Sequence, residues 1–161
     1  MPIVWRVTKP DAARVLDGGE TRERGGRWNS PGWAVLYASE NLALAALECL
    51  ANLPMTKRQE LREMAAVGIE IPDGPALCLE RHELEPHWIG SGGELWCRSI
   101  GDRWLEERSH LILSAPSVIV PRERNVMLNP SHPHIKDVRI AIIEPYTYDP
   151  RLAGGTDYSA D

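Results

Sequence analysis

The chain has 161 residues, of which 25% are charged and 43% apolar, so it is long enough to form one domain with a real core. Its net charge of −5 argues against a protein that binds nucleic acid through an excess of basic residues, and no direct nucleic-acid binding is expected. Three scattered cysteines without CxxC spacing, no long apolar run and no signal-peptide pattern predict a cytoplasmic protein without a membrane span.

The pattern of apolar and β-branched residues predicts strands at residues 3–7, 34–38, 67–71, 76–79, 111–113, 118–120 and 138–143. A brief helix is expected to open at Pro10 and to end before Gly18. A longer helix with Ser39 as its N-cap runs to about Asn52, and another covers residues 94–108. The predicted elements therefore mix strands with two main helices.

Motifs for nucleotide binding on a doubly wound sheet do not occur. No GxGxxG follows the first strand, and no GxxxxGK[ST] occurs in the sequence, which argues against a Rossmann or P-loop site. The strands are separated too unevenly for regular βαβ units, so an α+β fold with mixed or antiparallel sheets is predicted. We expect a single domain over residues 1–150 and a polar tail over residues 151–161.

A turn-rich loop over residues 20–33 contains the sequence RGGRWNSPG at positions 24–32. Its glycines and proline allow the backbone to approach a ligand closely. The guanidinium of Arg27 suits a pyrophosphate or the carboxylate of Glu48, although a surface arginine is an equal alternative. Trp28 offers a ring face but is more often a core residue, and Asn29 can simply close a turn.

Glu48 is the only charged residue between Leu42 and Ala51. At helical spacing its neighbours are apolar, and a carboxylate there requires a partner, a raised pKa or a polar ligand. The alternative is a partly exposed helix stripe. Tyr37, at the end of a predicted strand, can stack on a flat cationic ring or pack in the core. Glu48 is therefore the strongest candidate for chemistry.

A second group of polar candidate residues lies between positions 117 and 134. Ser117 interrupts two apolar runs and can hydrogen-bond a ligand or cap a strand end. Asn125 and Asn129 are expected in a polar loop with His132 and His134. The two histidines lack an evident third ligand, so no metal site is predicted.

These motifs resemble the RES domain, a family named for its arginine, glutamate and serine. The resemblance covers nearly the whole chain, and it is carried by GRWNxxG at 26–32, Tyr37, Ser39, Ala43, Glu48, Ala115, Pro116, Ser117, Asn125, Asn129, Pro130 and His132. It implies an ADP-ribosyltransferase-like core of mixed or antiparallel sheets with two main helices. It also implies a toxin of a bacterial type II toxin–antitoxin system, an Xre-type helix-turn-helix antitoxin as partner, and NAD⁺ as co-substrate.

The resemblance also implies roles for individual residues. Glu48, Arg27 and Tyr37 are the expected catalytic residues, with Glu48 stabilising the cationic sugar that forms as nicotinamide departs. The residues expected to bind NAD⁺ are Arg6, Arg27, Trp28, Asn29, Tyr37, Ser39, Ser117 and Asn129.

The acceptor of ADP-ribose divides the remaining hypotheses. Transfer to a cellular protein is favoured, and an NAD⁺ glycohydrolase or phosphorylase is the alternative. A non-catalytic nucleotide-binding or partner-docking module is a third possibility, which requires Glu48 to lie on the surface away from the Gly-Arg-Trp loop.

Overall fold

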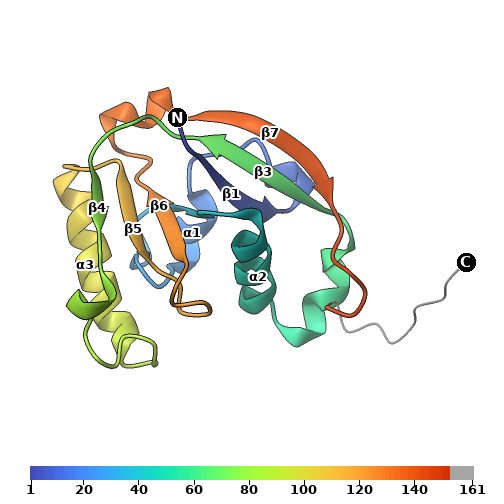
Figure 1. Cartoon of the computed structure of the whole chain (residues 1–161), viewed down its shortest axis with the longest axis horizontal. Coiled ribbons are helices and arrows are strands. Elements are labelled where there is room, and N and C mark those ends of the chain that lie inside the picture. The colour runs from blue at the N-terminus through green and yellow to red at the C-terminus, as the bar shows by residue number, and fades with distance from the viewer. Residues whose placement is uncertain (153–161) are drawn as a thin grey trace, which may run out of the picture.

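Seven strands form one sheet in the computed structural model, which describes residues 1–152 apart from the side chains of residues 59, 60 and 62. In chain order they are β1 (Ile3–Thr8), β2 (Leu36–Ser39), β3 (Met64–Glu70), β4 (Ala76–Cys78), β5 (Ile112–Pro116), β6 (Arg124–Leu128) and β7 (Arg139–Tyr146). Their order in space is β4-β5-β6-β2-β1-β3-β7 (Figure 1). Neighbouring strands are antiparallel except for β4 and β5, so the sheet is mixed.

The sheet has two halves that run in clearly different directions in Figure 1. The halves meet between β1 and β2, which share only the pair Trp5–Ser39, whereas β1 and β3 are paired along six residues. Ser39 is also paired with Asn125 of β6. The backbone around Ser39 is therefore the point at which the two halves join.

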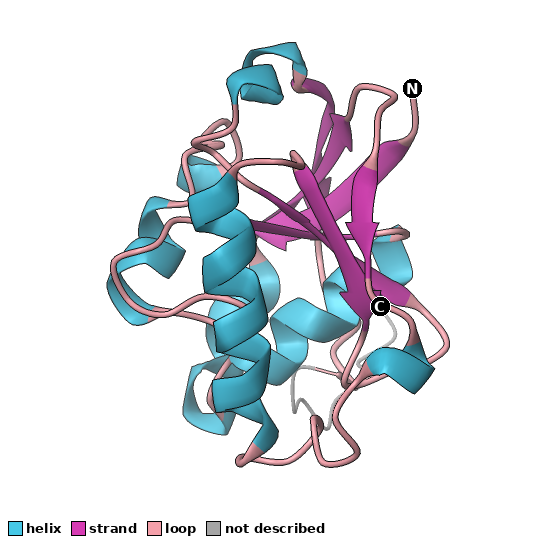
Figure 2. Cartoon of the chain, turned by 90° about the vertical axis from the view of Figure 1, so that its left-hand side faces the viewer, coloured by secondary structure: helices cyan, strands magenta, loops and turns pink. Residues whose placement is uncertain are grey.

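Three α-helices accompany the sheet in the described part of the chain: α1 (Gly19–Arg24), α2 (Leu42–Asn52) and α3 (Gly93–Glu107). Short 3₁₀ helices are η1 (Pro10–Ala12), η2 (Met55–Arg62), η3 (Arg81–Glu83) and η4 (Pro133–Asp137). Figure 2 shows α3, the longest helix, lying alongside the strands. Among residues 1–152, no helix is both long and apolar enough to cross a membrane.

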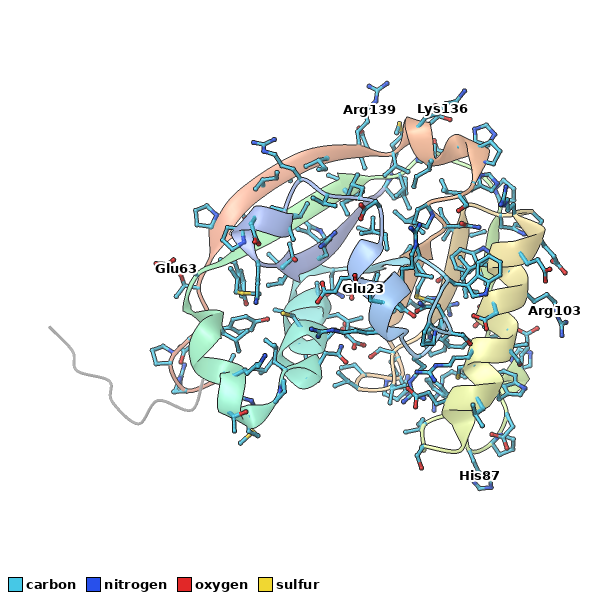
Figure 3. The ribbon with its side chains drawn as sticks, turned by 180° about the vertical axis from the view of Figure 1, so that it is seen from behind. Glu23, Glu63, His87, Arg103, Lys136 and Arg139 are labelled. Carbon is cyan, nitrogen blue, oxygen red and sulfur yellow. The ribbon has the colours of Figure 1, made fainter. Side chains whose placement is uncertain are left out.

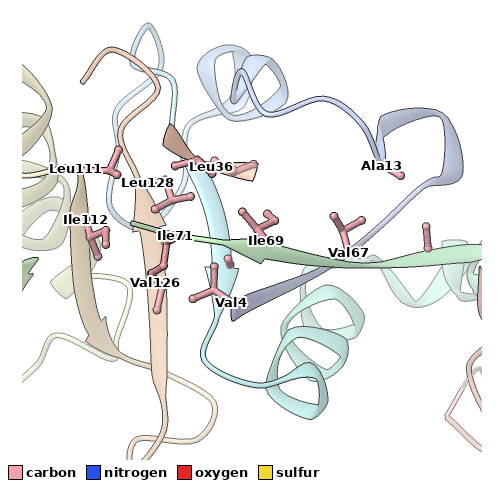
Figure 4. Close-up of a cluster of buried hydrophobic side chains, with 13 residues drawn as sticks. Val4, Ala13, Leu36, Val67, Ile69, Ile71, Leu111, Ile112, Val126 and Leu128 are labelled. Carbon is pink, nitrogen blue, oxygen red and sulfur yellow. The ribbon is translucent and has the colours of Figure 1, made fainter. Parts of the chain in front are cut away.

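The core lies on both faces of the sheet. On one face, apolar side chains from both halves form a continuous cluster that includes Val4, Val67 and Val126 (Figure 4). On the other face there are two separate clusters, one around α3 with Met127 and one around α2 with Val7. Strand alternation produces this division, because successive side chains of a strand point to opposite faces. The space between the α2 and α3 clusters is where polar side chains of the sheet can meet.

The α+β fold with two main helices is confirmed, as are β1, β2, β3, β4, β5, β7 and both long helices, within a few residues at their ends. Several local predictions were wrong. Residues 19–24 form α1 instead of belonging to a loop. The N-cap of α2 is Asn41, whose side chain accepts a hydrogen bond from Leu44 N at 2.8 Å, whereas Ser39 ends β2.

The segment after β5 also differs from the prediction. Residues 118–120 form a bend and not a strand, because the Ser117 hydroxyl accepts hydrogen bonds from the amides of Ile119 and Val120. Asn125 was expected in a loop but lies in β6. Of the predicted tail at 151–161, residues 153–161 lie outside the described residues.

Candidate active site

The segment Gly26–Ser30, called the arginine loop below, is hydrogen-bonded to Arg98 and Asp102 of α3. Arg98 Nε donates a hydrogen bond to the carbonyl of Gly26 at 2.9 Å. The carboxylate of Asp102 accepts two hydrogen bonds from Ser30, from its backbone N–H at 2.8 Å and from its hydroxyl at 2.6 Å. Charge-assisted bonds of this kind are stronger than neutral ones. The loop that carries Arg27 is therefore held in one position by the helix.

Gly101 allows this loop to approach α3 closely. A Cβ atom at position 101 would lie 1.7 Å from the carbonyl oxygen of Trp28, a separation that no side chain can adopt. The indole of Trp28 is 3% exposed and packs in the cluster around α3. Trp28 is thus a core residue, and its contribution to NAD⁺ binding stays a prediction.

Tyr37 and Asn29 form the inner support of the loop. The Tyr37 hydroxyl donates to Asn29 Oδ1 at 2.7 Å and accepts from the Trp28 amide at 3.0 Å. Asn29 is fully buried, and its amide nitrogen donates to the carbonyls of Thr21 and Trp33. Burial raises the pKa of Tyr37 above its ordinary value of 10, so this hydroxyl stays protonated. The Tyr37 hydroxyl therefore organises the loop, while its half-buried ring packs against the cluster around α3.

Arg27 points from this loop toward the segment before α3. Its Nη1 donates to the carbonyl of Trp88 at 2.8 Å. Burial raises the pKa of the Cys97 thiol, and the neighbouring Arg27 guanidinium opposes that rise. Within residues 1–152 no ion pair joins Arg27 to Glu48. Of the two ligands considered for the Arg27 guanidinium, a pyrophosphate and the Glu48 carboxylate, the second is therefore not bound to it in the structure.

Glu48 lies on α2, half-buried, and it faces the end of β5 and the start of β6. Its Oε1 accepts a hydrogen bond from the Ser117 hydroxyl at 2.8 Å and another from Asn125 Nδ2 at 2.5 Å. Asn125 Oδ1 in turn accepts from the Ser39 hydroxyl at 2.8 Å. We call these four residues, Glu48, Ser117, Asn125 and Ser39, the carboxylate cluster. By contrast, charged side chains such as Arg103, Lys136 and Arg139 project from the outside of the molecule (Figure 3).

The carboxylate cluster and the arginine loop are neighbours on the same face of the sheet. Tyr37 and Ser39 are two residues apart in β2, so both point to this face and lie roughly 7 Å apart along the strand. Tyr37 contacts the loop that carries Arg27, while Ser39 contacts Asn125. The segment that carries Arg27 is therefore linked to position 37 of β2, and Glu48 is linked through Asn125 to position 39 of the same strand.

Comparison with known proteins identifies the family. The RES domain family matches residues 3–149. This chain belongs to the RES domain family. It is 32% identical over 154 residues to the Prs ADP-ribosylating toxin of Sphingobium sp. (strain YBL2), covering 92% of this chain and 94% of that protein. It is 34% identical over 137 residues to Toxin Res of Yersinia enterocolitica, covering 84% of this chain and 87% of that protein.

The RES domain also has the fold of a solved toxin. The crystal structure of the M. tuberculosis MbcT–MbcA toxin–antitoxin complex contains a chain that superposes with a TM-score of 0.76 at 16% identity, covering 95% of this chain and 87% of that one. At this identity the likeness concerns the fold alone. It agrees with the α+β architecture predicted from the sequence.

Two residues of the RES domain that were expected to bind NAD⁺ lie in other surroundings. Arg6 donates to the carbonyl of Val15 and to the Thr8 hydroxyl, and burial lowers the pKa of its guanidinium. Asn129 lies four residues beyond Asn125, roughly 13 Å along the strand direction, and its amide donates to the carbonyl of Leu105. The structure does not bring Asn129 to the carboxylate cluster, and NAD⁺ binding by either residue stays a prediction.

Three residues important to this geometry were not among the predicted site residues. Asn125 bonds Glu48 directly, and Arg98 and Asp102 hold the arginine loop. A sequence signal exists for the last two, because Arg98 and Asp102 are four residues apart and share one face of α3. That stripe also fits an ordinary solvated helix face, so the sequence could not assign it to the loop.

Two cavities of the RES domain lie away from the carboxylate cluster. One of about 290 Å³ is lined by Pro10, Ala13 and the ends of β3 and β7, and one of about 300 Å³ lies between β4 and α3. Neither is lined by Arg27, Tyr37 or Glu48. Among residues 1–152 no group of three or more His, Cys, Asp or Glu side chains is arranged to hold a metal ion.

Proposed function

We propose that this RES domain is the toxin of a toxin–antitoxin pair, that it cleaves NAD⁺, and that it transfers ADP-ribose to a cellular protein. The relatives named above support the class of activity, since one is an ADP-ribosylating toxin and another a Res toxin. The observation that carries the proposal is Glu48. Its carboxylate is held by two donors on the same face of the sheet as the Arg27 loop.

The chemistry requires a fixed negative charge near the reacting sugar. When the bond between nicotinamide and ribose breaks, the bonding electron pair leaves with nicotinamide, which becomes neutral, and positive charge develops on the ribose. A carboxylate near that centre stabilises the transition state, as in glycoside hydrolysis. Glu48 supplies this carboxylate. It also accepts the proton that the incoming nucleophile loses when its lone pair bonds the ribose carbon.

Arg27 and Tyr37 bind and orient the dinucleotide in this proposal. The Arg27 guanidinium has further N–H donors besides the one that Trp88 accepts, and a fork of this kind suits the pyrophosphate. The half-buried ring of Tyr37 provides a face for nicotinamide, which is cationic before cleavage. Ser117, by contrast, acts through Glu48, because its hydroxyl donates to that carboxylate.

An antitoxin is the proposed protein partner. A solved chain of the same fold is part of a toxin–antitoxin complex, and a protein that consumes NAD⁺ in its own cell has to be held inactive. That this antitoxin is of the Xre type is a prediction from the family resemblance alone.

The test uses purified protein and NAD⁺ labelled on the adenylate phosphate, incubated with and without cell extract. Transfer to a protein gives labelled bands that need the extract, and these are absent for Glu48→Gln. The exposed acid Glu23 provides the matched control, and Glu23→Gln is expected to label as wild type does. Labelled ADP-ribose or its phosphate, formed equally without extract, would identify a hydrolase or phosphorylase instead. Intact NAD⁺ under both conditions would leave only a binding module.

A further inference from the structure

The two oxygens of the Glu48 carboxylate have different surroundings. Both donors of the carboxylate cluster, the Ser117 hydroxyl and Asn125 Nδ2, converge on Oε1. Oε2 has no hydrogen-bond partner among the residues that the structure describes. One oxygen is therefore anchored to the sheet and the other is left for a substrate group.

The donor directions in this cluster are fixed by chemistry. An ionised carboxylate only accepts, so at 2.5 Å the atom of Asn125 that faces Oε1 has to be the amide nitrogen. Asn125 Oδ1 then points to Ser39, whose hydroxyl donates to it. Ser117 is equally directional, because its oxygen accepts two backbone N–H groups and its single proton goes to Glu48.

Ser39 and Asn125 are positioned by the sheet itself. They are direct cross-strand partners in β2 and β6, and Ser39 is also paired with Trp5 of β1 at the junction of the two sheet halves. Ser39 is 2% exposed, so water does not compete for its hydroxyl. A chain of donors thus runs from the junction of the two sheet halves to a carboxylate on α2.

We propose that Asn125 is a positioning residue for Glu48, and that Ser39 sets the orientation of the Asn125 amide so that Oε1 is anchored and Oε2 meets the substrate. This inference rests on the proposed function, since it concerns the same carboxylate. It assigns to Asn125 and Ser39 an effect on turnover, whereas a purely structural role would affect only stability.

The consequence is a separation of turnover from binding. A carboxylate that loses one of two anchoring bonds can rotate, and misplacement of a catalytic group by about 1 Å costs on the order of 10²-fold in rate. NAD⁺ binding depends on the arginine loop in our account, so KM changes little. Ser39 touches Glu48 only through Asn125, so its effect should vanish when the Asn125 amide is absent.

The experiment measures nicotinamide release, KM for NAD⁺ and thermal unfolding for Asn125→Leu, Ser39→Ala and the double variant. We expect kcat to fall about 10- to 100-fold for Asn125→Leu and about 3- to 10-fold for Ser39→Ala, with KM within about twofold of wild type. The double variant should be no slower than Asn125→Leu alone. Ser114→Ala is the matched control, since this buried serine of β5 bonds Arg124 and does not contact Glu48.

Several outcomes would overturn the inference. One is a kcat for Asn125→Leu within twofold of wild type. Another is a change confined to KM, which would make Asn125 a binding residue. A third is a double variant whose fold-decrease in kcat equals the product of the two single decreases, which would show that Ser39 does not act through Asn125. If Asn125→Leu does not fold, Ser39→Ala alone still tests the inference, because an unchanged kcat for this small substitution would contradict the role of Ser39 in orienting Asn125. Glu48→Gln in the same assay tests the proposed function separately, because unchanged release there would refute that function.

Discussion

Because the arginine loop packs closely against α3, we expect an unusual effect of the substitution Gly101→Ala on stability. In the interior of an exposed helix, replacing glycine with alanine stabilises a protein by about 1 kcal/mol. At position 101 the new Cβ would lie 1.7 Å from the Trp28 carbonyl oxygen, which is 1.3 Å closer than the 3.0 Å below which real Cβ atoms are not found. The structure therefore predicts the opposite sign.

The size of the effect follows from two opposing terms. Overpacking of this kind costs about 1–3 kcal/mol or more, and moving the loop also weakens the bonds from Arg98 and Asp102. After subtracting about 1 kcal/mol of helix propensity, the free energy of unfolding should fall by about 2 kcal/mol. For a chain of 161 residues the entropy of unfolding is about 0.34 kcal/mol/K, so Tm should fall by about 6 °C.

The assay is thermal unfolding followed by circular dichroism, with NAD⁺ affinity measured by calorimetry on the same samples. Gly92→Ala at the N-cap of α3 is the control, because a Cβ there meets nothing within 4 Å, and its Tm should fall less than that of Gly101→Ala, since only a weaker cap is introduced. Gly101→Ala should also bind NAD⁺ more weakly, since the displaced loop carries Arg27. A higher Tm for Gly101→Ala would show that the loop does not rest on the helix.

Three further predictions concern the same loop. Tyr37→Phe leaves Asn29 Oδ1 and the Trp28 amide without their partner, so the free energy of unfolding at pH 7 should fall by about 2 kcal/mol in chemical denaturation. Burial raises the pKa of Tyr37, so its contribution to stability is complete below pH 10 and is lost as the pH rises above it. Over that range Tyr37 lowers the free energy of unfolding by about 1.4 kcal/mol per pH unit, a contribution that Tyr37→Phe should lack. Equal pH slopes for the two proteins would refute this. Arg27→Ala should weaken NAD⁺ binding at least about tenfold by calorimetry, since the pyrophosphate loses its fork, whereas the exposed control Arg103→Ala should not; unchanged affinity would reassign Arg27 to structure.

The sequence could single out Arg27 and Glu48 as candidates because their signals are local. A glycine-rich turn with an arginine, and one carboxylate in a ten-residue apolar helix, are each visible within a short window. The partner of that carboxylate was not visible. Asn125 is 77 residues from Glu48, and the polar start of β6 reads as a loop when the apolar residues that follow are too few to show alternation.

Competing local signals explain the other differences. Ser39 and Asn41 are both good N-caps, and the sequence cannot choose between them. The choice is tertiary, because the Ser39 hydroxyl is engaged by Asn125 across the sheet while Asn41 is free to cap α2. Residues 118–120 are β-branched and so favour a strand. The backbone amides of Ile119 and Val120 donate instead to the Ser117 hydroxyl, so they are not available for hydrogen bonds to a neighbouring strand.

The central claim is that the Glu48 carboxylate stabilises the sugar cation as nicotinamide leaves. Its most direct test is the rate of nicotinamide release at saturating NAD⁺, compared between wild type and Glu48→Gln, with NAD⁺ affinity measured on both proteins. The amide keeps the shape of the side chain and removes its charge, so we expect a rate lower by about 10²-fold or more and an affinity within about twofold of wild type. Nicotinamide released by Glu48→Gln at nearly the wild-type rate would contradict it.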